Sequence, residues 1–483
     1  MIVTLKKEWL TDPKTNILAG IVVALALIPE AIAFSIIAGV DPMVGLYASF
    51  IIAVSISILG GRPAMISAAT GAIALLVTPL VREYGVEYLL AATLLMGLIQ
   101  LILGIIKIGK LMKFIPKSVM LGFVNALAIM IFMSQIEHIF GISISTYLYV
   151  GVTLLIVYVV PRFFKAVPAP LIAIVVLTAL YLYMGADVRT VGDLGAIERS
   201  LPSFIIPDVP YTLETLRIIL PFSISMAIVG LVESLLTAKI VDDATDSYSS
   251  KNRESRGQGI SNIIAGFFGG MGGCAMIGQS IINVRSGATT RLSTFTAGMV
   301  LIFLIIVLGD LVVQVPMPIL AGIMVMVSIG TFDWGSFKYM TKAPRTDVVV
   351  MVVTVSIVLM THNLAIGVVA GVILSALFFA TKISNVEVDK TESGNEVNYR
   401  IDGQVFFASV DTMMNQIDLD DEDRTIELDF TNAHIWDDSG VDAIDTMITK
   451  MRRKNNQVYI RNLNKDSRKI INELSMINKE ELV

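Results

Sequence analysis

Apolar stretches of about 20 residues recur along most of this chain, from Thr15 to about Thr381. Each stretch is long enough to cross a hydrocarbon layer about 30 Å thick as a helix. The chain is 55% hydrophobic and 16% charged, whereas soluble domains are about 45–50% apolar and about 25% charged. A soluble fold could not bury this much apolar surface, so the sequence predicts a polytopic α-helical membrane protein.

Turn residues divide the apolar region into about fourteen predicted spans. With both termini on the cytoplasmic side, the loop lysines and arginines gather mainly in the internal loops, which agrees with the positive-inside bias. We expect a multi-pass protein of a bacterial cytoplasmic membrane. The predicted spans are 15–38, 44–60, 66–82, 88–106, 117–136, 145–161, 167–185, 214–239, 258–272, 275–286, 292–309, 316–332, 346–361 and 363–381.

The composition changes near Lys382, where charged residues become frequent and apolar segments become short. This change predicts a transmembrane domain over residues 1–382 and a cytoplasmic domain over residues 383–483. In the second part, RTIELDF is typical of a strand and GVDAIDTMITKMRRKNN of an amphipathic helix. Alternating strands and helices predict a small α/β fold for this domain.

Residue types that would support other functions are scarce. The single cysteine, Cys274, excludes an intramolecular disulfide and a multi-thiolate metal site, and the three histidines are scattered. The sequence contains no nucleophile–base constellation and no basic stripe suited to nucleic acid. We therefore expect neither an enzyme nor a nucleic-acid-binding protein, and we expect no cofactor.

The two halves of the membrane region share a weak pattern. The Pro-to-Gly spacing of IPKSVMLG at Pro116 recurs in VPMPILAG at Pro316, and Glu30 in the first span matches Glu233 in the eighth. Because seven spans per half is an odd number, the second half would enter the membrane from the opposite side. The pattern therefore predicts a 7+7 inverted repeat, as in many secondary transporters.

Glycine-rich segments precede the third and tenth predicted spans. Inverted-repeat transporters bind substrate where two broken helices meet near the midplane, and a helix start offers unpaired N–H groups and a dipole to an anion. The alternative is close helix packing through small residues. The predicted helix starts are Thr70-Gly71-Ala72 and Ala275-Met276-Ile277.

Acidic residues inside predicted spans are candidates for ion coupling, because such residues are costly in a membrane. Glu30 follows Pro29, and Thr237 lies one helical turn after Glu233. Either acid could carry a proton, and Glu233 with Thr237 could instead hold sodium together with backbone carbonyls. The alternative is a paired or lipid-edge glutamate that has no role in transport.

The chain contains, in order, IPEAIAFSIIAG, GLYASF, GGRPAMISAATGA, VGLVESLLTA, GQGISNIIAGFFGGMGG and NVRSG. This series resembles the sulfate permease (SulP) family of anion transporters over essentially the whole chain. The resemblance implies a seven-plus-seven inverted repeat like that of the uracil–proton symporters. It also implies a moving core of spans 1–4 and 8–11, a gate of spans 5–7 and 12–14, an elevator-type motion and a homodimer.

The same resemblance implies residue roles. Glu233 would be the cation-coupling position, with Thr237 near it, where sodium-driven bicarbonate members have Asp. Glu30 stands where many relatives have an uncharged residue. The longer acid and the second acid favour proton symport over sodium symport. The implied anion-binding residues are Phe34, Thr70, Gly71, Ala72, Ala275 and Met276.

In the C-terminal part, the loop HIWDDSGVDAID resembles the signature of STAS domains. In soluble relatives a serine of this loop can be phosphorylated, which implies Ser439 as a regulatory phosphosite here. The alternative is that Asp and Ser cap the start of a helix. A cytoplasmic partner that binds this domain is a further expectation.

Together these features predict a secondary active transporter of a small inorganic anion that is coupled to protons and has no metal site. Sulfate is the first candidate anion and bicarbonate the second. One alternative is sodium-coupled symport of bicarbonate or a dicarboxylate. A nucleobase symporter is disfavoured by the STAS-like domain and by the lack of polar side chains at 275–277. A membrane-anchored signalling protein is disfavoured by Glu233 and the two helix starts.

Overall fold

The computed structural model describes residues 8–163, 167–185, 187–193 and 200–475. The chain divides into two compact units after Val372. Among the described residues, nine helices are long and apolar enough to cross a membrane, and all nine begin in the first unit. This unit is therefore the multi-pass membrane part of the chain.

Every stretch predicted as a span contains one helix. The helices are α2 (Pro13–Ala38), α3 (Pro42–Leu59), α4 (Gly71–Tyr84), α5 (Val86–Ile105), α6 (Lys117–Ile139), α7 (Ile144–Phe163), α8 (Ala169–Met184), α9 (Leu213–Ala244), α10 (Lys251–Phe267), α11 (Ile277–Arg285), α12 (Arg291–Val313), α13 (Met317–Thr331), α14 (Gly335–Lys342), α15 (Arg345–Thr361) and α16 (Leu364–Ile383).

The structure differs from the predicted elements in three ways. The third and tenth predicted spans begin as short strands, β1 (Ser67–Ala69) and β2 (Gly273–Ala275), before their helices start. Helix α14 follows α13 in a segment predicted as a loop, and its eight residues are too few to cross a membrane. Short 3₁₀ helices occur at Ile108–Phe114 and Val191–Asp193.

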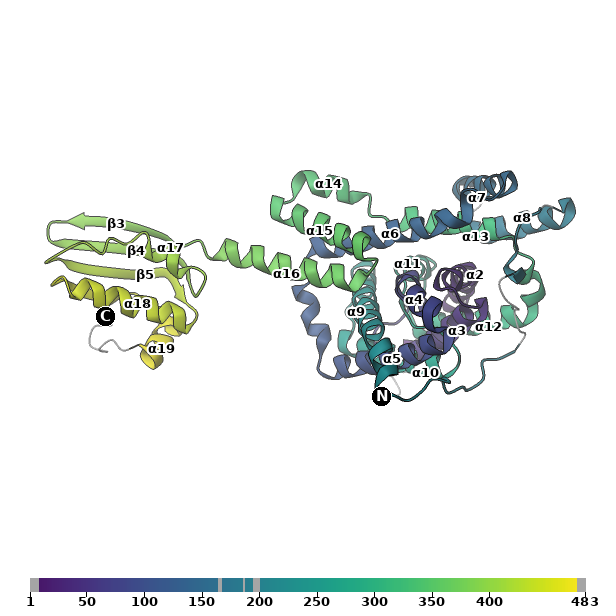
Figure 1. The fold of residues 1–483 in the computed structure, drawn as a ribbon, viewed down its shortest axis with the longest axis horizontal. Coiled ribbons are helices and arrows are strands. Elements are labelled where there is room, and N and C mark those ends of the chain that lie inside the picture. Colours follow the sequence, from purple (N-terminus) through teal and green to yellow (C-terminus); the bar gives the residue numbers. More distant parts are fainter. Residues whose placement is uncertain (1–7, 164–166, 186, 194–199, 476–483) are drawn as a thin grey trace. The chain divides into compact units, whose positions relative to one another are not determined.

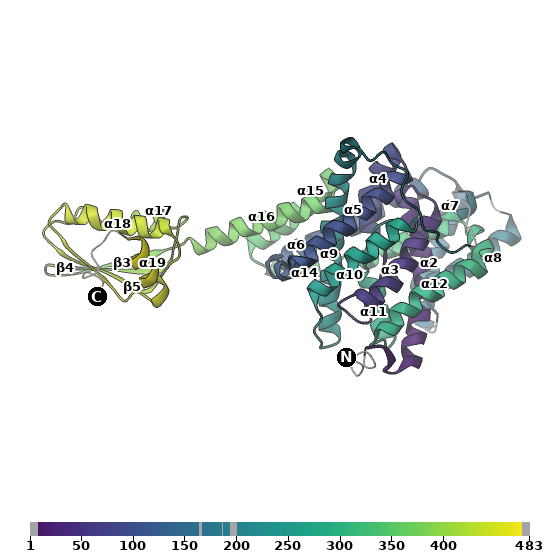
Figure 2. The same cartoon turned by 90° about the horizontal axis from the view of Figure 1, so that it is seen from below.

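The membrane helices pack in two bundles (Figure 1). In the first bundle, α2, α3, α10 and α12 lie side by side, and α5 and α9 pack against α10 (Figure 2). Helices α4 and α11 pack against α2 and α9 within this bundle. In the second bundle, α6 packs against α13 and α15, and α7 packs against α8 and α13. Segments from both halves of the sequence thus contribute to each bundle.

The C-terminal unit contains a four-stranded sheet in the order β3-β4-β5-β6. Strands β3 and β4 form an antiparallel hairpin, whereas β4, β5 and β6 are parallel to one another. The elements are β3 (Glu387–Ser393), β4 (Glu396–Val405), α17 (Val410–Met414), β5 (Thr425–Ile435), α18 (Asp438–Arg452), β6 (Gln457–Arg461) and α19 (Lys465–Leu474).

The sheet and its helices enclose an apolar core of their own, which includes the fully buried Tyr399, Phe430, Ile444 and Met447. Alternating burial along β4 and β5 places Tyr399 and Phe430 on the inner face of the sheet, and Ile444 and Met447 come from α18. The α/β fold predicted for this part of the chain is therefore present. The sequence pattern alone did not predict that β4 and β5 pair in parallel.

Helix α18 begins in the loop that was predicted to hold a phosphosite. The Oδ1 atom of Asp437 accepts the N–H of Gly440 at 3.0 Å, and its Oδ2 atom accepts the N–H of Phe407 at 2.9 Å. Asp437 is the N-cap, and Ser439 lies half-buried in the first turn. Of the two residue types that we considered as caps of this helix, Asp and Ser, it is Asp437 that makes the capping hydrogen bond.

Replacing Asp437 by alanine should destabilise the C-terminal domain, because the change removes both the N-cap bond and the bond to Phe407. We expect the free energy of unfolding to fall by about 1–2 kcal/mol, measured by urea unfolding of an isolated segment 384–475. Asp438→Ala is the matched control, since Asp438 is exposed and, within the described part of the chain, its side chain accepts only the N–H of Ser439. Equal losses for both variants would contradict the capping role of Asp437.

Candidate functional site

Two broken helices meet inside the first bundle. Strands β1 and β2 pair antiparallel, with Ala68 opposite Cys274. Each strand leads into a helix, so that α4 begins at Gly71 and α11 begins at Ile277. Because the strands run in opposite directions, the two helices leave this short ladder from its opposite ends.

Polar side chains satisfy the backbone groups of the strands. The N–H of Gly273 donates to Asn262 Oδ1 at 2.8 Å, and Asn262 Nδ2 donates to the carbonyl of Gly273 at 3.1 Å. The N–H of Ala275 donates to Ser234 Oγ at 3.0 Å. A side chain at Gly273 would collide with the carbonyl oxygen of Ala68. Extended backbone is therefore held here without water, which a membrane interior requires.

The two helix starts are uncapped. Thr70 and Met276 are the N-cap residues; both have extended backbone, and neither side chain makes a capping hydrogen bond. The N–H groups in the first turn of any helix have no acceptor within that helix. At both starts these groups, together with the positive ends of the helix dipoles, are left to bind whatever occupies the space in front of them.

That space is a cavity of about 100 Å³. Most of the predicted site residues line it, and so do residues from α6, α11 and α13 that the sequence did not indicate. The predicted residues that line it are Glu30, Phe34, Thr70, Gly71, Ala72, Glu233, Met276 and, from the predicted helix start, Ile277. The additional residues are Phe123, Val124, Leu127, Ile131, Gly278, Gln279, Val327 and Thr331.

Phe34 lies directly against the start of α4. A Cβ atom on Gly71 would lie 2.8 Å from Phe34 Cε1 and 3.3 Å from Ile131 Cδ1. Such distances are shorter than van der Waals contact, so only glycine lets the ring remain in this position. Phe34 therefore forms one wall of the cavity next to the N–H groups of α4.

Glu233 joins both broken helices through Cys274. The Cys274 thiol donates to Glu233 Oε2 at 2.9 Å, and its Sγ atom lies 3.0 Å from Thr70 Oγ1. Glu233 is 7% exposed. Cys274 therefore links the acid on α9 to the N-cap residue of α4, a contact that the sequence did not indicate.

Glu30 has a partner on the opposite half of the chain. Gln279 Nε2, in the first turn of α11, donates to Glu30 Oε1 at 2.7 Å. Gln279 is buried, and its Oε1 atom has no hydrogen-bond partner among the described residues. Both side chains line the cavity. The two acids therefore flank one space, each held by an uncharged donor.

Two predicted residues lie outside the cavity lining. Ala275 belongs to strand β2, and its N–H is already bonded to Ser234. The hydroxyl of Thr237 donates to the backbone carbonyl of Glu233 at 2.7 Å, and not to the carboxylate. Hydroxyls on helices commonly bond the carbonyl one turn earlier. Sequence spacing correctly placed Thr237 one turn from Glu233 but did not indicate this bond.

No lysine or arginine lines this cavity within the described part of the chain. Among its described lining residues, the two glutamates are the only acidic or basic side chains, and the other polar groups are N–H groups, hydroxyls and an amide. Positive potential therefore comes from backbone groups and helix dipoles, an arrangement that can hold an anion without a cationic side chain.

Gln279 and Cys274 are the functional candidates that sequence reasoning missed. An acid inside a membrane bundle needs a polar partner, and this requirement could have directed attention to the few polar residues near the predicted helix starts. Which of them reaches which acid depends on the antiparallel pairing of β1 and β2, and three-residue strands leave no periodic signal in a sequence.

Comparison with known proteins gives matches over both units. The sulfate permease family matches residues 14–354, and the STAS domain matches residues 387–482. YbaR of Bacillus subtilis, a protein named for sulfate transport, is 56% identical over 473 residues, which cover 98% of this chain and 99% of YbaR. The bicarbonate transporter BicA of Picosynechococcus is 24% identical and covers 80% of this chain, with 73% of BicA matched.

Two solved structures share the fold. The murine Slc26a9 anion transporter in its inward-facing state superposes with a TM-score of 0.83 at 17% identity, covering 95% of this chain and 86% of that one. The transmembrane domain of a cyanobacterial BicA gives a TM-score of 0.65 at 24% identity, covering 75% of this chain and 96% of that domain.

The family match covers most of the membrane unit, and the relative at 56% identity spans nearly the full length of both chains. The matched family consists of transporters and not of enzymes. The chain belongs to the sulfate permease family and carries a C-terminal STAS domain.

Proposed function

We propose that this protein is a secondary active transporter of a small inorganic anion, with sulfate as the first candidate and bicarbonate as the second. The observation that carries the proposal is the pair of uncapped helix starts that face one small cavity beside two acids. The names of the relatives support the order of candidates, since YbaR is named for sulfate and BicA for bicarbonate.

The size of the cavity favours an ion over a larger solute. Sites for drug-sized ligands are typically about 300–1,000 Å³, and this cavity is about 100 Å³. A nucleobase would also need side chains that read its edge. At the start of α11, Met276, Ile277 and Gly278 offer none, and the amide nitrogen of Gln279 is already bonded to Glu30. These features support an anion substrate over a nucleobase.

Coupling to protons follows from the charges around the cavity. An anion that binds beside Glu30 and Glu233 would be repelled by both carboxylates if they were ionised. Protonation of one acid removes a negative charge and so strengthens anion binding. Glu233 is the proposed coupling residue, because Cys274 and Thr70 connect it to the helix start that would hold the anion.

The two bundles supply the parts for alternating access. We propose fourteen spans in a 7+7 inverted repeat, with spans 1–4 and 8–11 moving as an elevator against spans 5–7 and 12–14 within a homodimer. The cavity lies between these groups, since α6 and α13 of the second bundle line it opposite α2, α4, α9 and α11. The protein would reside in the cytoplasmic membrane with both termini on the cytoplasmic side. Its transmembrane domain would end at residue 382, and the STAS domain would follow.

The STAS domain would regulate transport by binding a cytoplasmic partner. Ser439 remains the proposed phosphosite, because it lies in the first turn of α18, where the helix dipole favours added negative charge. Asp437 and Asp438 stand beside it and would oppose a phosphate. Phosphate at Ser439 would therefore repel the Asp437 carboxylate and weaken the hydrogen bond by which Asp437 caps α18.

The transport proposal is tested with the purified chain in proteoliposomes that carry an imposed proton gradient. We expect labelled sulfate or bicarbonate to accumulate, and we expect accumulation to stop when the gradient is collapsed. Accumulation that a sodium gradient alone can drive would contradict proton coupling. It would instead support the sodium-coupled alternative, with sodium bound at Glu233 and Thr237. If neither anion enters under any gradient, the proposed transport of these two anions is wrong.

Glu233→Gln should abolish gradient-driven accumulation, because the amide cannot take up and release a proton. The concentration ratio of labelled anion across the membrane is expected to fall to about one, while exchange of anion without a gradient persists. Glu137→Gln is the matched control, since Glu137 is exposed near the end of α6. Unchanged accumulation in Glu233→Gln would contradict the coupling assignment.

Gly71→Ala should impair transport, because the added methyl group would displace the Phe34 ring from the helix start. Overpacking of this kind costs about 1–3 kcal/mol, so we expect the initial uptake rate to fall by about tenfold. Gly151→Ala on α7 is the control, since a Cβ atom there meets no heavy atom within 4 Å. Equal uptake by both variants would show that the Phe34 contact is not needed.

A further inference from the structure

A second cavity, which shares no lining residue with the anion site, lies at the loop ends of the first bundle. Its volume is about 600 Å³. Three loops form its wall: the loop before β1, the loop between α9 and α10, and the loop between α11 and α12. The loop charges predict that all three loops lie on the cytoplasmic side.

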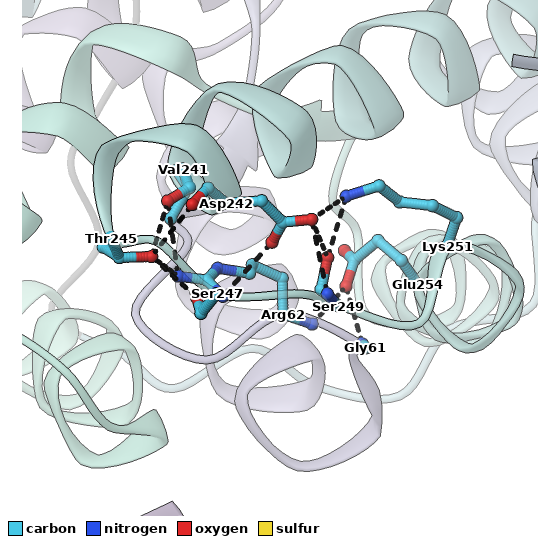
Figure 3. Close-up of polar contacts among 9 residues, drawn as sticks. All are labelled: Gly61, Arg62, Val241, Asp242, Thr245, Ser247, Ser249, Lys251 and Glu254. Atoms are coloured by element: carbon cyan, nitrogen blue, oxygen red, sulfur yellow. Dashed lines mark hydrogen bonds and ion pairs between the residues drawn. The ribbon is translucent and has the colours of Figure 1, made fainter. Parts of the chain in front are cut away.

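Arg62 is the best-anchored cation of this cavity (Figure 3). One guanidinium nitrogen donates to Ser247 Oγ at 2.6 Å and lies 3.2 Å from Asp242 Oδ1, and the other donates to Thr245 Oγ1 at 2.6 Å. The side chain is 7% exposed. Its Nε atom is buried without a hydrogen-bond partner among the described residues.

The nearby carboxylates lie behind this wall and hold the loops together. Asp242 is shared between Arg62 and Lys251, whose Nζ atom lies 2.6 Å from Asp242 Oδ2. Glu254 accepts the N–H groups of Gly61 at 2.7 Å and of Arg62 at 3.1 Å (Figure 3). Neither acid lines the cavity. The two carboxylates therefore hold the loops together and lie outside the cavity.

Two further arginines face the same space. Arg253 donates to the carbonyl oxygens of Ile58 and Leu59, each at 3.3 Å, and carbonyls carry no formal charge that would offset it. Arg291 pairs with Glu8 at 2.7 Å. Among the described lining residues, three guanidinium groups thus face one carboxylate, that of Glu8. The lining residues by themselves carry net positive charge, and Asp242 behind them offsets the charge of Arg62.

Helix starts and hydroxyls add to this positive wall. Ser250 is the N-cap of α10, and Arg291 is the first residue of α12; both line the cavity. The positive ends of two helices of 17 and 23 residues therefore lie at its wall. Hydroxyls of Ser247, Ser249 and Thr289 line it as well. Arginines, hydroxyls and helix N-termini are the groups that proteins use to hold phosphate.

We propose that this cavity binds a phosphate group, carried either by a lipid headgroup or by a soluble phosphate compound. Its volume lies within the range of about 300–1,000 Å³ that suits ligands larger than a simple ion. The ligand would bridge three loops whose helices lead to the anion site: the first enters α4, the second follows α9 with Glu233, and the third follows α11. The site does not depend on which anion is transported.

The test uses the purified full chain and measures its thermal unfolding temperature. Inorganic phosphate is titrated in neutral detergent, and vesicles of phosphatidylcholine with or without phosphatidylglycerol are compared in parallel. A saturable rise with inorganic phosphate assigns a soluble source, and a rise only with phosphatidylglycerol assigns a lipid source. If neither probe raises the unfolding temperature, the proposed site is wrong.

Arg253→Gln should weaken the affinity of the active probe by about tenfold or more, as expected for the loss of one charged donor. Arg256→Gln is the matched control, because it makes the same charge change on the same helix at an exposed position outside the lining. Arg253→Lys keeps the charge and should recover part of the affinity. Equal weakening by Arg253→Gln and Arg256→Gln, or none by the former, would place the probe elsewhere and overturn the proposal.

Discussion

The pairing of β1 with β2 is the interaction on which the membrane unit depends. A bilayer supplies no water to satisfy extended backbone, and the three-residue strands must therefore satisfy one another and borrow donors and acceptors from Asn262 and Ser234. Because these side chains bond the strands and not the helix starts, the first turns of α4 and α11 keep their N–H groups unpaired. The hydrogen bonds that satisfy the strands in lipid thus leave free the N–H groups to which we assign anion binding.

Charge is divided sharply between the two cavities. The small cavity holds two acids and no lysine or arginine among its described lining residues, whereas the larger one has three arginines at its wall. A transported ion has to leave its site again, and a site built from backbone dipoles binds without the deep attraction of a desolvated guanidinium. A regulatory or lipid ligand faces no such requirement.

Much of this arrangement could be predicted from the sequence. The glycine-rich segments indicated the helix starts near Gly71 and Ile277, and intramembrane cost indicated Glu30 and Glu233, which line one cavity in the structure. The partners Gln279 and Cys274 could not be predicted, because a partner is fixed by tertiary pairing. Ala275 was expected at the site, but its N–H is bonded to Ser234 because β2 extends to that residue. The transport roles of all these residues remain predictions.

The ladder between the two halves also has a consequence for biosynthesis. Ile66 and Ser280, which are bonded at the edge of the ladder, are 214 residues apart along the chain. At a synthesis rate of about 5–20 residues per second, the first strand waits about 10–40 s for its partner. During that time the backbone of β1 lacks its ladder partner. The nascent first half must therefore be sheltered by water, by the insertion machinery or by a temporary partner until the second half is made.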